Sequence, residues 1–206
     1  MMQYPKIPGS KYAPRKPCIA FNKCDGSNMR YEWSKKRGWY KFGSRNQMLD
    51  TSHPFLGEAI PLFLKKYAEP LEEVFSTNKK YKDKDQYTVF CEFFGKESLA
   101  GMHKEKDPKD IVLFDIWKFK YGFIGPKNFV KDFGHLEIPK VVYEGVLTGK
   151  FADDVRNGVY DVDEGVVCKG GSGGKEDIWM CKIKTYAYMK KLKEVYQDNW
   201  QQFWES

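Results

Sequence analysis

The stretch AFNKCDGSNMRYEW, residues 20–33, places a lysine, an aspartate and a glycine between an apolar run and an aromatic one. Asp-Gly is typical of a turn, because glycine accepts a positive φ and the aspartate side chain can hydrogen-bond back onto the turn. The flanking segments CIAFNK and NMRYEW have the composition of two short strands. A turn that carries K-x-D-G by chance is the plain alternative, so the rest of the chain decides whether Lys23 has chemistry to perform.

Several further segments predict strands. WYKFGS follows an SKKRG hairpin turn, and the nearly continuous apolar runs YTVFCEFFG (87–95) and DIVLFDIWKF (110–119) are typical of buried strands. KVVYEGVLT, DEGVVCKG and WMCKIKT predict three more. Between the last two, GGSGGKED (170–177) is expected to be a flexible glycine-rich loop.

Helical spacing appears in two places. Residues 54–76 show it with interruptions at Pro61 and Pro70, and the tail 186–206 has the pattern of an amphipathic closing helix. Many strands with few helices, not in strict βαβ alternation, predict an antiparallel α+β fold. We expect one domain over 1–185, with the tail helix packed on it or extending it.

Composition narrows the class of protein. Hydrophobic residues make up 41% of the 206 residues, which is enough for a substantial core. The net charge of +7 favours an acidic partner such as nucleic acid or a nucleotide, although a lysine-rich surface without a partner is the alternative. The five cysteines form no C-x-x-C pair, which disfavours a zinc site or a disulfide framework and indicates a reducing compartment. With no apolar run of membrane-spanning length, we expect a cytoplasmic protein without membrane contact.

Four charged residues lie in segments that otherwise predict strands. Glu92 is inside TVFCEFFG, Glu164 opens EGVVCK, and Lys182 and Lys184 flank Ile183. The two lysines therefore point to one face of a strand. Unpaired buried charges are costly, so these side chains are expected to meet each other or a ligand. The alternative is that the strands lie at sheet edges and the charges face water.

Six blocks in order, K-x-D-G, S-R, E-F-F-G, F-D-I, E-G-V-V-x-K and K-x-K, resemble the covalent nucleotidyltransferase superfamily of polynucleotide ligases and mRNA capping enzymes. The match runs from Phe21 to Thr185, which is nearly the whole chain. The resemblance implies an adenylation domain of two antiparallel β-sheets flanked by helices. It also implies that a lysine takes AMP from ATP, that AMP passes to a 5′-phosphate end, and that a 3′-hydroxyl displaces it and seals the strand.

The resemblance assigns the reacting groups. Lys23 would be the nucleophile, which must be unprotonated, and neighbouring cations with partial burial favour the neutral form of a lysine. Lys182 and Lys184 would contact the α-phosphate and neutralise the charge that builds on the pentavalent phosphorus. Mg²⁺ would be held through Glu164, with phosphate oxygens and waters completing its shell.

Four more residues match positions that contact the nucleotide in the family. Glu92 resembles the glutamate that binds the ribose, and Arg45 the arginine that contacts the ribose and the reacting strand's phosphate. Phe114 occupies the position of the aromatic that stacks on the purine, with an ordinary core phenylalanine as the alternative. Lys169 closes the E-G-V-V-x-K block and would reach the base or a phosphate.

The residue two places past the motif glycine indicates the acceptor. DNA ligases and capping enzymes usually have arginine there, whereas KCDGSN has Asn28. Asparagine at this place resembles the phage and bacterial RNA ligases of the nick-sealing kind, where it helps to position the nucleotide phosphate. Those enzymes often carry histidine where Asp25 stands, so the match is partial. Asp25 and Gly26 are assigned to the nucleotide site with Asn28.

The length on either side of the six blocks bears on the donor. The 21 residues after Thr185 are too few for an OB-fold domain, and the 22 before Lys23 are too few for the extra domain of an NAD-dependent ligase. We therefore expect ATP as the donor, RNA ends or a nicked duplex as the partner, and a second protein or domain that helps to hold the nick. If the chain is phage-encoded, the compartment is the host cytoplasm. A DNA-nick ligase and a non-catalytic nucleic-acid-binding protein of the same fold are the alternatives.

Overall fold

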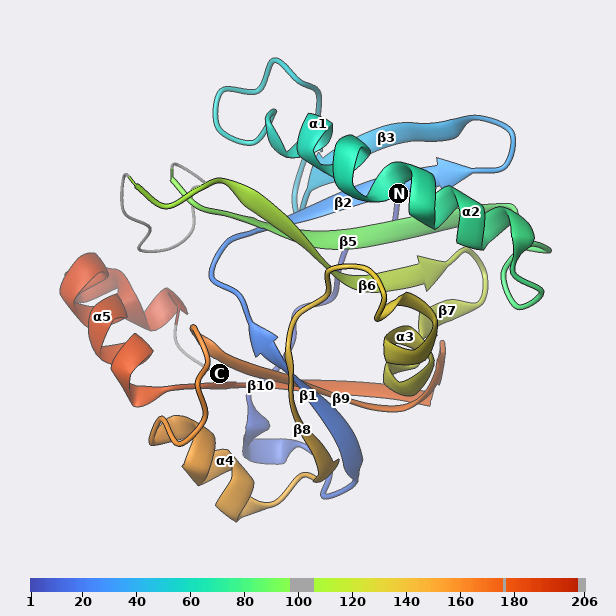
Figure 1. The fold of residues 1–206 in the computed structure, drawn as a ribbon. Helices are drawn as coiled ribbons and strands as arrows, with labels where there is room; N and C mark the ends of the chain where they lie inside the picture. Colours follow the sequence, from blue (N-terminus) through green and yellow to red (C-terminus); the bar gives the residue numbers. More distant parts are fainter. Residues whose placement is uncertain (97–105, 176, 204–206) are drawn as a thin grey trace. The chain divides into compact units, whose positions relative to one another are not determined.

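The computed structural model describes residues 1–96, 106–175 and 177–203 (Figure 1). The chain divides into two compact units, each formed from separated segments. The first unit consists of Met1–Tyr4, Asp25–Ile124 and Phe129–Ile138, and the second of Pro5–Cys24, Gly125–Asn128 and Pro139–Ser206. In the part of the chain that is described, no helix is long and apolar enough to cross a membrane.

The first unit is built on antiparallel strands in the order β4-β3-β2-β5-β6-β7. Their bounds are β2 (Ser27–Ser34), β3 (Gly38–Ser44), β4 (Met48–Leu49), β5 (Gln86–Phe94), β6 (Asp110–Lys118) and β7 (Gly122–Ile124). Gly38 has a φ of 64° in the tight turn between β2 and β3, which only glycine adopts without strain. The hairpin predicted from SKKRG is therefore confirmed.

A continuous helical run covers these strands, formed by α1 (Ala59–Phe63), the π-helical segment η2 (Leu64–Ala68) and α2 (Glu69–Thr77) (Figure 1). Phe63 stacks on Tyr31 of β2 with ring centroids 3.7 Å apart, and Phe75 on Tyr87 of β5 at 3.9 Å. Pro70 has no backbone N–H for a helical hydrogen bond, and the π-helical segment lies directly before α2, where this donor is missing. The predicted helix over 54–76 is thus present from Ala59 onwards.

The second unit is built on antiparallel strands in the order β10-β9-β1-β8. Its elements are η1 (Ser10–Tyr12), β1 (Pro17–Lys23), β8 (Val141–Val146), α4 (Gly149–Arg156), β9 (Gly165–Gly174), β10 (Asp177–Lys184), α5 (Tyr186–Tyr196) and η3 (Gln197–Phe203); α3 spans Pro126–Phe133. Few helices and consistently antiparallel pairing confirm the predicted α+β class. The separation into two distinct sheets and the domain boundary after residue 185 stay predictions.

The glycine-rich segment, of which residue 176 lies outside the described residues, is largely strand, whereas a loop was predicted for it. β9 continues through it to Gly174, and Asp177 of β10 pairs with Gly173. Gly171 has a φ of 94°, and a Cβ there would lie 2.3 Å from the carbonyl oxygen of Asp177. The glycines thus allow the two strands to approach closely at the end of a hairpin.

In the described part of the tail, which leaves out residues 204–206 of the prediction, the α-helix is shorter than predicted. Thr185 caps α5 by accepting a hydrogen bond from the backbone of Tyr188, and α5 buries Tyr188, Met189 and Leu192. At Gln197 the φ becomes 44°, which side-chain-bearing residues rarely adopt, and the chain continues as the 3-10 segment η3. The apolar periodicity predicted the helix but contained no sign of this backbone break.

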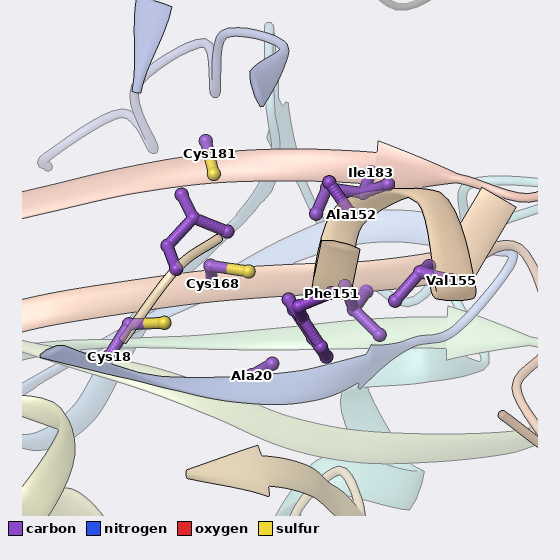
Figure 2. Packing of buried hydrophobic residues seen from close by; sticks show 10 residues of the cluster. Cys18, Ala20, Phe151, Ala152, Val155, Cys168, Cys181 and Ile183 are labelled. Atoms are coloured by element: carbon purple, nitrogen blue, oxygen red, sulfur yellow. The ribbon is translucent and has the colours of Figure 1, made fainter. Parts of the chain in front are cut away.

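Three cysteines lie on adjacent strands in the core of the second unit (Figure 2). Cys18 is on β1, Cys168 on β9 and Cys181 directly opposite it on β10, and α4 packs against the same face through Phe151 and Val155. Hydrogen bonding with its two cysteine neighbours, together with burial, raises the pKa of Cys168. The hydrogen bond with Cys168 lowers the pKa of Cys18, but all three side chains are buried among apolar groups, so the cluster is packing rather than accessible thiolates.

Thiol reactivity is expected to follow this burial. All five cysteines are free thiols, and only Cys24 is half-exposed. An alkylating reagent at neutral pH is expected to modify Cys24 at least ~10³-fold faster than the other four, because a buried thiol reacts only after the core opens. Mass spectrometry of peptides after timed alkylation measures the order. Equal rates at Cys24 and Cys168 would contradict the packing, and equal rates in urea provide the control.

Candidate active site

Three charged residues meet where three strands of the second unit come together. Lys23 ends β1 and Lys184 ends β10, and both pair with Gly165 at the start of β9. Gly165 has a φ of 151°, and a Cβ there would lie 2.0 Å from the carbonyl oxygen of Ile183. A glycine is therefore needed for β10 to approach β9 at this point, which brings the two lysines to the same place.

The backbone of Glu164 fixes this junction on both sides. Its N–H donates to the carbonyl oxygen of Lys23 at 3.2 Å, and its carbonyl oxygen accepts from the N–H of Thr185 at 3.1 Å. The residue is thereby tied to the end of β1 and to the residue after β10. Its side chain then has two lysines within reach.

The side chain of Glu164 forms ion pairs with both lysines. Its Oε1 lies 2.7 Å from Lys184 Nζ, and its Oε2 pairs with Lys23 Nζ. The Glu164 side chain is 4% exposed, that of Lys184 8% and that of Lys23 23%. Two cations around one carboxylate leave the cluster with net positive charge, which suits an anion. Lys23 is the most accessible of the three to such a ligand.

The strand register brings two more predicted lysines to the same face. Lys182 alternates with Lys184 on β10, as the sequence predicts, and Lys169 on β9 is opposite Met180, which belongs to that alternation. Lys169 is buried, with its Nζ 5.5 Å from the ring centroid of Phe21 on β1. The opposite face carries the cysteine cluster. One face of this sheet is therefore apolar and packed, and the other carries four lysines.

The donor set of the cluster bears on the predicted metal. Among the described residues, no group of three or more histidine, cysteine, aspartate and glutamate side chains could hold a metal ion. Mg²⁺ usually takes only one or two carboxylates, with phosphate oxygens and waters as its other ligands. Glu164 fits that pattern when a nucleotide supplies the phosphates. A dedicated all-protein metal cage does not fit these residues.

The first unit carries the remaining predicted residues. Asn28 of β2 is directly opposite Glu92 of β5, and Gly26 lies so close to Phe93 that a Cβ would be 2.4 Å from its carbonyl oxygen. Asn28 Oδ1 is buried without a hydrogen-bond partner among the described residues. An orphaned buried acceptor requires an explanation, and a ligand group that donates a hydrogen bond to it is one. Asp25 is half-buried, and Arg45 is exposed just after β3.

Phe114 contacts a residue that sequence reasoning missed. Tyr4 packs at right angles to Phe114, with ring centroids 5.0 Å apart, and also contacts Phe90 at 4.9 Å. Burial and Asp115, which accepts a hydrogen bond from the Tyr4 hydroxyl at 2.8 Å, raise the pKa of Tyr4. The charge of Glu92 adds to this rise, so Tyr4 also lies near the predicted ribose ligand.

Replacing Tyr4 with phenylalanine tests this contact. The change removes the hydrogen bond that the Tyr4 hydroxyl donates to the buried Asp115 carboxylate, so we expect the free energy of unfolding to fall by about 1–3 kcal/mol. Urea denaturation measures it. Tyr12→Phe is the matched control, since Tyr12 is largely exposed, and should leave stability unchanged. Equal stability of both variants would contradict a structural role for the Tyr4 hydroxyl.

A family model described as RNA ligase matches residues 16–183. The chain belongs to the RNA ligase family. The matched range contains the K-x-D-G motif, Glu164 and Lys182, and stops one residue before Lys184. The resemblance to polynucleotide ligases carried by the six sequence blocks is therefore confirmed at the level of the family.

Solved structures with the same fold as this RNA ligase family member come from Naegleria gruberi. Its RNA ligase with PPi has a TM-score of 0.67 at 16% identity, covering 94% of this chain and 58% of that chain. A mutant with ATP and Mn gives a TM-score of 0.66 at 16% identity, covering 92% and 58%, and a mutant with AMP and Mn gives 0.65 at 15%, covering 93% and 58%. The chain thus spans less than two thirds of the length of these relatives. No curated protein sequence matches it.

Proposed function

We propose that this chain is the adenylating part of an ATP-dependent RNA ligase and that Lys23 forms a covalent lysyl-AMP intermediate. The observation that carries the proposal is the cluster of Lys23, Glu164 and Lys184, where the partly exposed amine of Lys23 stands beside the buried Glu164–Lys184 pair and the three side chains together carry net positive charge. Naegleria gruberi RNA ligase has been solved with ATP, with AMP and with PPi. These are the substrate, the transferred group and the leaving group of such a step, which supports the proposal.

In the first step the lone pair of Lys23 Nζ attacks the α-phosphorus of ATP. An N–P bond forms, the bond from the α-phosphorus to the bridging oxygen of pyrophosphate breaks, and pyrophosphate leaves with that electron pair. The Lys23 amine must lose a proton to solvent before it attacks. The paired carboxylate of Glu164 opposes that loss, and the positive charges of Lys182 and Lys184 favour it. The same two cations stabilise the negative charge that develops on the phosphorus oxygens.

A divalent metal, most simply Mg²⁺, would be held by Glu164 together with nucleotide phosphates and waters. When bound, it would supply further neutralisation of the phosphate charge. Glu164 itself then has two tasks. Before nucleotide arrives it is the counter-ion of Lys23 and Lys184.

The first unit would contribute contacts to the nucleoside. Glu92 would accept hydrogen bonds from ribose hydroxyls, Phe114 would stack on the purine, and Arg45 would contact the ribose and the phosphate of the reacting strand. Asn28 would donate from its side-chain N–H to the nucleotide phosphate, with Asp25 and Gly26 shaping the turn and Lys169 of the second unit adding a contact to base or phosphate. In the remaining steps AMP passes to a 5′-phosphate end, and a 3′-hydroxyl displaces AMP to close the strand.

Two measurements test the proposal. The protein, freed of bound nucleotide, is mixed with Mg²⁺ and ATP labelled at the α-phosphate, then denatured and separated on a gel. Label on the chain supports a covalent enzyme, and a folded protein without label would favour a non-catalytic nucleic-acid-binding protein.

Sealing of an RNA nick is then compared with sealing of a DNA nick of the same sequence. Faster sealing of DNA would replace RNA ligase with DNA ligase in the proposal.

The proposal also covers how the RNA substrate is held and in which cellular compartment the protein acts. The relatives are longer than this chain, which supports a further domain or an accessory protein that helps to hold the RNA. A cytoplasmic location is proposed from the free thiols.

A further inference from the structure

The second unit contains a cavity of about 650 Å³ beside the lysine cluster. Its walls are the leader segment 8–14, the end of α4 at Arg156, the edge strand β10 and the start of α5. A smaller cavity of about 230 Å³ shares Ser10, Lys11, Ala13 and Arg156 with it. We call the two together the leader groove. Apart from Lys184, its lining residues take part in no step of adenylation described above.

The leader is held in place along the groove. The carbonyl oxygen of Pro8 accepts from the N–H of Lys182 at 2.9 Å, and that of Lys16 accepts from the N–H of Leu147 at 3.0 Å. Between these points, the Arg156 side chain donates to Ser10 Oγ at 2.8 Å. Hydrogen bonds thus fix the wall at both ends and in the middle. The groove is therefore a pre-formed surface of this unit.

The side chains that line the groove carry positive charge. Four of them are cationic, namely Lys11, Arg15, Arg156 and Lys184, and neither cavity has an acidic residue in its described lining. Arg156 and Lys184 do have acidic partners, Asp153 and Glu164, which lie outside the lining. A concave surface with this charge attracts a polyanion. The phosphate backbone of a nucleic acid fits it. A neutral peptide lacks the negative charge, and an acidic peptide lacks regularly spaced anions combined with flat rings.

Two exposed aromatic rings lie on the same walls. Tyr12 is 87% exposed and Tyr186 is 57% exposed, and the apolar side chains of Met180 and Met189 lie in the same lining. Lys11 Nζ lies 5.1 Å from the ring centroid of Tyr12. Aromatic rings interleaved with cations are the chemistry by which proteins hold single-stranded nucleic acid, because bases stack on the rings while phosphates meet the cations.

Lys184 joins the groove to the lysine cluster, because its side chain lines the cavity and pairs with Glu164. We propose that the leader groove binds a single-stranded segment of the RNA whose end reacts at Lys23, with bases on Tyr12 and Tyr186 and phosphates at Lys11, Arg15 and Arg156. This inference rests on the proposed function for the identity of the strand. It adds a substrate site formed by the leader, outside the adenylation machinery.

The test measures RNA binding and adenylation separately. Binding of a fluorescent single-stranded RNA by the full chain is followed by anisotropy at several salt concentrations, and labelling with ATP is measured on the same preparations. Lys11→Ala with Arg15→Ala is expected to reduce the slope of log K against log salt by about 1.4, at about 0.7 per lost phosphate contact. Tyr12→Ala is expected to weaken binding by roughly 5- to 150-fold, and Tyr12→Phe to keep it.

A matched control distinguishes RNA binding in the leader groove from nonspecific attraction by positive surface charge. Lys190→Ala with Lys191→Ala removes two exposed lysines of α5 that line neither cavity, and is expected to keep the wild-type affinity and slope. All variants alter exposed groups, so labelling by ATP and the unfolding midpoint should match wild type. Wild-type affinity and slope in the Lys11 and Arg15 variant would overturn the groove, as would an equal effect of the Lys190 and Lys191 variant. Absence of ATP labelling in wild type would instead count against the proposed function, whatever the RNA binding.

Discussion

Replacing Lys23 with arginine is expected to abolish covalent labelling by ATP, lowering its rate by on the order of 10⁴- to 10⁶-fold, as for the removal of other covalent nucleophiles. Arginine keeps a positive charge beside Glu164, so the buried carboxylate keeps a counter-ion. It stays protonated in proteins and has no lone pair to offer the α-phosphorus. The fold is retained and the nucleophile is lost. Gel separation of denatured protein after reaction with α-labelled ATP measures the effect.

The control for this variant is the same lysine-to-arginine change at an exposed position outside the lysine cluster. Lys190 on α5 is exposed, and Lys190→Arg should label as wild type does. The unfolding midpoint of the Lys23→Arg protein should lie close to that of wild type, which excludes misfolding as the cause. Wild-type labelling of the Lys23 variant would mean that another lysine reacts. Lys182 and Lys184, on the same face, would then be the first to replace.

The sequence predicted the strands well where local chemistry decides them. The apolar runs around Phe90 and Leu113 form buried central strands, because their continuous apolar side chains are stabilised by burial on both faces of a sheet. Alternation placed Lys182 and Lys184 on one face, as the register confirms. The charged residues on apolar strands were expected to meet each other, and Glu164 does pair with Lys184 and Lys23.

Long-range contacts were beyond that reasoning. Tyr4 donates to Asp115, which is 111 residues away, and no local pattern links them. The need for glycine at position 165 depends on how closely β10 approaches β9, and the Glu-Gly dipeptide in the sequence does not reveal that distance. The glycine-rich segment was misread because its positive-φ residues are typical of loops, yet here they allow a hairpin to close. Partner strands, rather than propensity, decided the last two of these places.

Replacing Glu164 with glutamine is expected to affect both stability and labelling. Glutamine keeps the shape, but Lys184, whose side chain is 8% exposed, loses its charged partner. Breaking a buried pair by removing one partner costs roughly 3–5 kcal/mol, and we expect about 3 here because Lys23 reaches solvent. Labelling is expected to slow by roughly 10²- to 10³-fold, because Glu164 would hold the Mg²⁺ that neutralises charge on the phosphate. Urea denaturation and timed labelling measure the two effects.

Glu58→Gln is the matched control, since Glu58 pairs with Lys109 at 2.8 Å through a side chain that is 61% exposed. It should change stability by less than about 1 kcal/mol and leave labelling intact. Unchanged stability of the Glu164 variant would contradict the ion-pair cluster itself.

A titration with Mg²⁺ separates the structural role of Glu164 from its proposed role as a metal ligand. Lys184→Met also breaks the buried pair, so both variants should be less stable than wild type. Only the Glu164 variant loses a carboxylate ligand, and ligand loss weakens metal binding whatever the stability. We therefore expect its labelling to need a higher Mg²⁺ concentration for half-maximal rate, with the Lys184 variant unchanged in that concentration. The same Mg²⁺ requirement in both would mean that Glu164 acts only as a counter-ion and that the metal, if used, is held by the nucleotide and water.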